Sequence, residues 1–296
     1  MMNKTILALG CLLSAVFGAG CVHTQVRGTA GATAEVTIED TAFVNHRYAA
    51  AERVRVEQPA LPVRILPGET DSITVKCYVE RMKVNVPDYR IGVRRSDSAL
   101  EIYQEPVNGV SVRDVSGYLE VYVPAGVKEI TLKTVSGRID IEGVSVDRLR
   151  ATNVSGGIEI RESKADDELQ LRTLSGGVEA WDIAGSRADI ETVSGGIRGK
   201  NIDFDILHAK AVQGGIVAYL GGRTRQVYGE TISGGVRLFL KGGDLGAHRY
   251  DLRTITGGIR VAGVVQAQRK YHSDGRAGGI SVEAEAVAGG IAVRRW

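Results

Sequence analysis

The sequence predicts an all-β protein: a single-chain parallel β-solenoid of about nine coils, each of about twenty residues, with an N-terminal β cap. Three observations predict this fold. Glycine-bearing turns recur at spacings of 19 to 23 residues, alternating apolar and polar residues fill the segments between them, and like residues occupy the same place in each unit. The first glycines of successive units are Gly117, Gly137, Gly156, Gly176, Gly195, Gly214, Gly234, Gly257 and Gly278, with an irregular repeat at Gly289.

Each unit contains two short stretches that alternate with a period of two. An apolar-x-apolar triplet follows the glycines, as at residues 158–160 (IEI), and a second one comes later, as at residues 169–171 (LQL). Residues of one parity are apolar and those of the other are polar. One face of each strand is therefore expected in the core and the other in solvent.

The turn repeats a Thr-aliphatic-Ser-Gly-Gly pattern, for example at residues 173–177. Parallel strands about 4.8 Å apart would stack the equivalent residues in columns. We expect the aliphatic column to fill a continuous core, and the hydroxyls to bond along their column or to cap backbone groups. Glycine is expected because the corner needs positive φ or leaves no room for a Cβ. The aliphatic column is Val135, Val154, Leu174, Val193, Val212, Ile232 and Ile255. The structural turn residues are Ser136, Gly137, Ser155, Gly156, Ser175, Gly176, Ser194, Gly195, Gly214, Ser233, Gly234 and Gly257.

The N-terminus has the pattern of an export signal. Lys4 precedes an apolar stretch from Ile6 to Phe17, and small residues then lead to Cys21. We predict a signal peptide at residues 1–20, lipidation of Cys21 and a lipid-anchored linker at residues 21–50. Ordinary signal cleavage and a retained anchor are the alternatives. Val22 is not acidic, which favours the outer membrane, although the sequence does not select the periplasmic or the surface face.

The cysteines fit an exported protein without an intrachain disulfide. If Cys11 leaves with the signal and Cys21 is acylated, Cys77 alone remains. Cys77 lies in an alternating stretch, so we expect it to be a buried small apolar residue.

Two regions have the character of solenoid ends. Residues 51–115 contain alternating strands without the Gly-Gly turn and are expected to form the N-terminal β cap, with the repeat domain at residues 116–296. Residues 277–296 (AGGISVEAEAVAGGIAVRRW) shorten the period to about eleven, and we expect them to close the other end.

Residues 118–144 (YLEVYVPAGVKEITLKTVSGRIDIEGV), followed by repeated VSGGIEI-type units, carry a family resemblance. The chain resembles the bacterial "putative adhesin" proteins of unknown function with β-strand repeats, over about residues 51–296. The resemblance implies a β-solenoid and an envelope or surface location, and it brings no catalytic residues. Gln213 in place of serine, the long unit at 234–256 and the lipoprotein-type leader depart from the family pattern.

The composition and the scattered polar residues favour no catalytic or metal centre. The formal net charge is +2, with 37 basic and 35 acidic residues, so no nucleic-acid-binding surface is indicated. The five histidines lack metal-ligand spacing, and no cofactor is expected. The repeated Ser-Gly-Gly lacks the context of a nucleophile elbow.

One column of polar residues follows the Gly-Gly turns and changes sign along the chain. Its members are Asp140, Glu159, Glu179, Arg198, Val217, Arg237 and Arg260. This column is a candidate binding stripe for a charged partner or for self-association. The alternative is simple avoidance of long like-charge ladders on an exposed surface.

The sequence thus favours a non-enzymatic, lipid-anchored envelope protein whose β-solenoid presents an extended binding or adhesion surface. The partner would be the membrane, through the lipid, and an envelope protein, a glycan or a second copy. A polysaccharide-active enzyme that uses Asp140, Glu159 and Glu179 is one alternative. A self-assembling structural envelope protein is the other.

Overall fold

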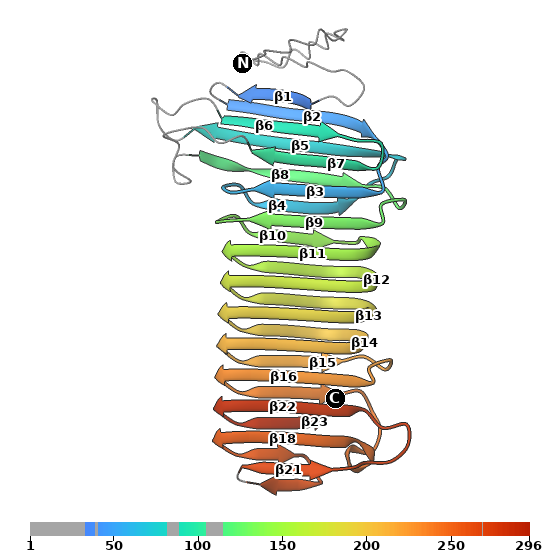
Figure 1. Ribbon diagram of the computed structural model, residues 1–296, viewed down its shortest axis with the longest axis vertical. Coiled ribbons are helices and arrows are strands. Elements are labelled where there is room, and N and C mark those ends of the chain that lie inside the picture. Colours follow the sequence, from blue (N-terminus) through green and yellow to red (C-terminus); the bar gives the residue numbers. More distant parts are fainter. Residues whose placement is uncertain (1–32, 39–40, 82–88, 105–114, 268) are drawn as a thin grey trace, which may run out of the picture. The chain divides into compact units, whose positions relative to one another are not determined.

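The structure is a computed structural model of the 296-residue chain, and it describes residues 33–38, 41–81, 89–104, 115–267 and 269–296. The described chain is built of β-strands, many of them parallel, which confirms the predicted all-β solenoid class (Figure 1). Two units are distinguished, residues 1–137 and 138–296. The boundary is expected after residue 115 but lies after residue 137. The reason is that β8 (Val115–Val123) and β9 (Glu129–Thr134) pair with strands of the first unit. The predicted signal peptide and Cys21 lie outside the described residues.

The first unit contains two sets of hydrogen-bonded strands. One set has the order β1-β6-β7-β3-β9, with β7, β3 and β9 parallel to one another. The other has the order β2-β5-β8-β4, with β8 and β4 parallel. The remaining strands are β1 (Thr33–Ile38), β2 (Thr41–Ala49), β3 (Arg53–Gln58), β4 (Val63–Pro67), β5 (Ser72–Arg81), β6 (Tyr89–Arg95) and β7 (Ala99–Gln104).

Alternation builds the core of this unit. Val54 and Val56 of β3, like Val75 and Cys77 of β5, are buried, while the residues between them are more exposed. Cys77 is 1% exposed, and burial raises the pKa of its thiol, so it stays protonated and packs as an apolar side chain. Residues 21–50 are the predicted linker. The structure corrects the part from Thr33 onward, because β1 and β2 there pair with β6 and β5.

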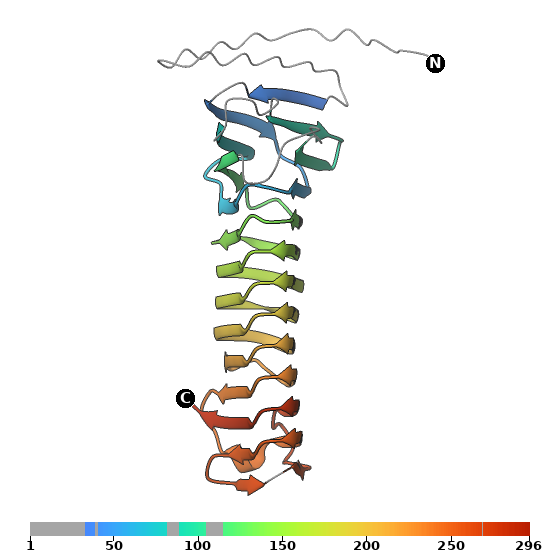
Figure 2. The same ribbon diagram turned by 90° about the vertical axis from the view of Figure 1, so that its left-hand side faces the viewer.

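The second unit is a stack of coils in parallel register, seen face-on in Figure 1 and edge-on in Figure 2. Its early strands are β10 (Ile139–Glu142), β11 (Ser145–Ser155), β12 (Ile158–Ser175), β13 (Val178–Ser194) and β14 (Ile197–Gln213). Then follow β15 (Ile216–Leu220), β16 (Gln226–Ser233) and β17 (Val236–Leu240). Each of β12 to β14 bends once at a residue with positive φ, namely Glu162, Asp182 or Asn201, so one strand contributes to both sides of a coil.

One buried column of this unit is formed by the residue directly after each Gly-Gly, with Ile139 following Gly137-Arg138 in the first coil. In register order it comprises Ile139, Ile158, Val178, Ile197, Ile216, Val236, Ile291 and Ile259, each at most 2% exposed. The predicted alternation after the glycines therefore places its apolar residues inside, as expected.

The final segment of the chain is an internal coil of this unit. Strand β22 (Ser281–Ala288) pairs in parallel with both β16 and β18 (Arg249–Thr256), and β23 (Ile291–Arg295) pairs with both β17 and β19 (Ile259–Val261). In Figure 1, β22 accordingly lies between β16 and β18. The expectation that residues 277–296 form an end cap is therefore wrong. Gly289, rather than Gly278, is the in-register turn glycine, since its φ is 144° and it lies over Gly234.

The end of the second unit comes from residues earlier in the sequence. A short 3-10 turn, η2 (Leu245–Ala247), precedes β18. Strand β20 (Val265–Ala267) pairs antiparallel with β19, and β21 (Lys270–Ser273) pairs antiparallel with β18. An antiparallel strand stops the parallel stacking on that side, which is how β20 and β21 cover the open edge of the last coil.

Candidate functional site

The Gly-Gly turns stack closely enough to exclude any side chain at their first position. Gly176 and Gly195 have φ of 155° and 151°, and a Cβ on Gly195 would lie 2.2 Å from the carbonyl oxygen of Gly176. Gly156, Gly214, Gly234 and Gly257 have the same conformation. In the first unit, a Cβ on Gly137 would lie 2.0 Å from Leu61 O. The backbone N–H groups of Gly156, Gly176, Gly195, Gly214 and Gly234 donate to the next coil, as from Gly176 to Ser194 O at 2.8 Å.

A threonine hydroxyl holds each turn in place. This threonine lies two residues before the end of its strand, as Thr192 does in β13. Thr192 Oγ1 donates to Gly176 O at 2.8 Å, and Thr254 Oγ1 donates to Gly289 O at 2.7 Å. Thr173 and Thr231 make the equivalent bonds to Gly156 and Gly214. The serines at Ser155, Ser175, Ser194 and Ser233 are exposed, whereas Ser136 donates to Pro59 O at 3.1 Å.

The aliphatic residue of the turn points outward, contrary to the expectation that it fills the core. Leu169, Leu171 and Thr173 share the inward parity, so Leu174 lies on the outer face. We name the resulting row the aliphatic file. In register order it comprises Val154, Leu174, Val193, Val212, Ile232, Val287 and Ile255. All except the half-buried Val212 are 36–61% exposed.

The outward charged column is in register but is not an open acidic stripe at its early end. Asp140, Glu159 and Glu179 are successive register partners. Glu159 is 5% exposed and is ion-paired with both Arg138 and Arg161. Arg138 also pairs with Asp140, and Glu179 lies 3.9 Å from Arg198. These carboxylates therefore serve the ion pairs of the solenoid surface, which gives no support to their use as a paired acid and base.

The late end of the same column forms a shallow groove. The sequence order predicts that Arg237 of β17 and Arg260 of β19 are adjacent in the column. In the structure, Ala292 of the inserted β23 lies between them. Arg294 also lines the groove, together with Gln266 of β20. We call this region the arginine groove. No carboxylate stands among its lining residues.

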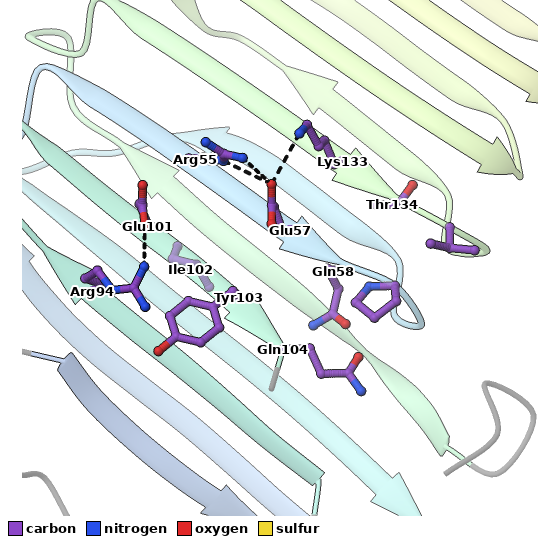
Figure 3. A pocket seen from close by; sticks show the side chains of 12 residues that line it. Arg55, Glu57, Gln58, Arg94, Glu101, Ile102, Tyr103, Gln104, Lys133 and Thr134 are labelled. Carbon is purple, nitrogen blue, oxygen red and sulfur yellow. Dashed lines mark hydrogen bonds and ion pairs between the residues drawn. The ribbon is translucent and has the colours of Figure 1, made fainter. Parts of the chain in front are cut away.

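A second groove, of about 750 Å³, lies on the first unit (Figure 3). Glu57 accepts from Arg55 and lies 3.4 Å from Lys133, and the hydrogen bond from Arg55 lowers the pKa of Glu57. Arg94 pairs with Glu101 at 3.2 Å and lies over the ring of Tyr103. Each labelled charge in Figure 3 thus has an opposite charge beside it. The sequence did not predict this groove, because its lining residues come from four strands, β3, β6, β7 and β9, that share no motif.

No group of three or more potential metal ligands occurs in the described part of the chain. Within the same residues, no helix has the length and apolar character needed to cross a membrane.

Together, the stacked glycine turns and the exposed rows along them define a β-solenoid protein. A family model described as Toastrack DUF4097, a domain of unknown function, matches residues 52–293. The chain belongs to this family.

Solved structures share the fold at low sequence identity. One, described as a "putative adhesin" from Bacteroides fragilis NCTC 9343, is 14% identical, with 85% of this chain and 97% of that chain covered and a TM-score of 0.51. Another "putative adhesin", from Parabacteroides merdae ATCC 43184, is 10% identical over 86% of this chain and 96% of that chain, also with a TM-score of 0.51. The comparison with curated proteins finds no match.

Proposed function

We propose that this chain is a non-enzymatic, lipid-anchored protein of the cell envelope whose second unit binds a partner through the aliphatic file. The single observation that carries the proposal is the file itself. Six of its seven residues are 36–61% exposed, at equivalent positions of successive coils. Contiguous apolar rows of this kind are uncommon on a protein surface that binds nothing.

The energetics of the aliphatic file favour a binding role. Burying the exposed half of one aliphatic side chain contributes roughly 1 kcal/mol. The whole file therefore offers several kcal/mol before the costs of association are subtracted. The neighbouring columns are polar: Ser175 and Ser194 lie on one side, and Arg172 and Glu191, paired at 3.2 Å, lie on the other. An apolar centre with a polar rim is the usual anatomy of a protein interface.

The envelope location rests on the leader. A lipid on Cys21 would hold the second unit near the membrane. The aliphatic file could then bind a partner in the same envelope. The neighbours described as "putative adhesin" support this role by analogy alone. Cys21→Ser should move the protein from the membrane pellet to the supernatant on cell fractionation.

The binding role is tested with a triple variant of the file, Leu174→Ser, Val193→Ser and Ile232→Ser. Because these side chains are exposed, the variant should fold normally, yet its binding to isolated cell envelopes should fall by about tenfold or more. The matched control is Arg172→Ser, Glu191→Ser and Glu230→Ser, two residues earlier in the same strands. It removes only surface ion pairs, which contribute little. Equal binding by both variants and the unchanged protein would refute the role of the file.

A further inference from the structure

The arginine groove differs from the rest of the charged column in having no acidic partner. Along the early coils, Arg138 and Arg161 pair with Glu159, and Arg198 lies 3.9 Å from Glu179. In the groove, Arg260 donates to the neutral side chain of Gln266 at 3.4 Å. None of the three groove arginines, Arg237, Arg260 and Arg294, has an ion pair with the described residues.

The inserted coil creates the shape of the groove. Ala292 is the register partner of both Arg237 and Arg260, so the Cα atoms of these arginines lie about 10 Å apart, two strand spacings. The methyl group of Ala292 leaves the space between the two long side chains open. Arg294, two residues beyond Ala292 on the same face, lies in register with Phe239. Three guanidinium groups from three chain segments therefore border one notch.

The chemistry of the notch is that of an oxyanion site. Guanidinium groups cannot lose their charge in water, and each presents a planar fork of N–H donors that matches phosphate or carboxylate oxygens. Three positive charges gathered without a carboxylate repel one another, and a bound dianion would relieve that repulsion. Gln266 adds an amide that can donate to the same ligand.

We propose that Arg237, Arg260 and Arg294 form a binding site for a phosphate monoester group. This site is separate from the aliphatic file and does not rest on the proposed function. The phosphate is carried by a small molecule in solution or by a lipid headgroup, since both present the same dianion to the notch. Ala292 is the positioning residue, because its small size keeps the two flanking arginines apart and available.

The site is tested on the full chain with Cys21→Ser, which removes the expected lipid and with it any anchoring to vesicles. The probes are inorganic phosphate, glucose 1-phosphate, and vesicles of phosphatidylcholine with or without phosphatidic acid. Calorimetry for the small probes and vesicle sedimentation measure affinity. Arg237→Gln with Arg260→Gln should weaken binding by roughly tenfold or more. Arg198→Gln, in the same column but beside Glu179, should leave affinity within about twofold of the unchanged protein.

A second variant separates loss of the site from loss of the fold. Ala292→Glu places a carboxylate between Arg237 and Arg260, where it should pair with both and exclude the phosphate. Binding should fall by roughly tenfold or more, while the melting temperature stays the same or rises.

Each outcome bears on the proposal. Binding of small phosphates alone identifies a ligand in solution. Vesicle binding that requires phosphatidic acid and is lost in the double variant identifies a lipid headgroup. Absence of saturable binding to every probe, or equal weakening by Arg198→Gln, overturns the proposal. Vesicle binding that the double variant retains overturns it as well.

Discussion

The threonine and the first glycine of the repeated turn each have a separate structural reason. The threonine hydroxyl bonds to a glycine carbonyl of the preceding coil, as Thr192 does to Gly176. The first glycine is required because its φ is positive and a Cβ would strike the carbonyl below, as at Gly195. The aliphatic residue between them, such as Val193, has no such structural role. Its repetition on the outside of the solenoid therefore calls for a functional reason, which is why we assign it to binding.

The first prediction concerns one turn glycine. Gly195→Ala would force a Cβ to within 2.2 Å of Gly176 O at a φ of 151°, so we expect the free energy of unfolding to fall by roughly 3 kcal/mol or more. Gly222→Ala is the control, because a Cβ there would meet nothing within 4 Å. Urea denaturation followed by circular dichroism measures both. Equal stability of the two variants would contradict the stacking of the turns.

The residue scale also shows what the sequence could predict. The turn period and the inward parity of residues such as Leu169 and Leu171 follow from alternation alone. The same alternation places Thr173 inside and Leu174 outside. The expectation that Leu174 lies in the core rests on its apolar character instead of on its parity. A parity count carried through the turn would have found the aliphatic file. The buried threonine is tolerated inside because its hydroxyl finds a carbonyl at the turn.

At the scale of elements, the insertion of β22 and β23 between earlier strands could not be predicted from the sequence. The coils present nearly the same edge, with an aliphatic residue after Gly-Gly and, except at Gln213, a small or hydroxyl-bearing residue before it. Ala286 occupies the threonine position between Thr231 and Thr254, without the hydroxyl that those residues use at the turn. Nearest-neighbour packing between like coils is therefore nearly indifferent to their order, and the length of the connection decides which edge a strand reaches. The arginine groove shares this origin, since Ala292 and Arg294 arrive with β23.

The second prediction concerns the end coil that contains β18. His248 is 9% exposed, its Nδ1 accepts from the backbone N–H of Ile280 at 3.1 Å, and burial lowers its pKa, with Asp244 opposing. The unfolded chain therefore takes up a proton first as the pH falls through the ordinary histidine pKa of about 6.5. The contribution of neutral His248 to the free energy of unfolding is therefore fully present above that pH. It is lost as the pH falls below 6.5 toward the lower pKa of the folded state.

Hydrogen exchange of β18 amides measures this effect. Their protection should fall between about pH 7 and pH 5 once intrinsic exchange rates are corrected for. His248→Asn keeps a side-chain acceptor but does not titrate in this range, so its protection should be independent of pH there. A pH-dependent loss that persists in the Asn variant would assign the effect to another group.

At the scale of the whole molecule, the second unit is a stack in which each coil contacts its neighbours, so the cost of a defect depends on its place in the stack. The order in space differs from the order in sequence. Gly289 follows Gly257 in the sequence, but in the stack it lies between Gly234 and Gly257. Gly257 therefore belongs to the last parallel coil. This difference allows the topology to be tested with one substitution at each glycine.

The third prediction compares Gly257→Ala with Gly289→Ala. Both place a Cβ against a backbone carbonyl, at 2.3 Å from Gly289 O and 1.9 Å from Gly234 O, so the local clash is similar. Gly257→Ala should loosen the end coil and leave the amides of β16 protected, because an end can fray alone. Gly289→Ala should lower protection in both β16 and β18, because β22 pairs with each of them. If the C-terminal segment were the end of the stack, the result would reverse, and Gly289→Ala would leave β18 protected.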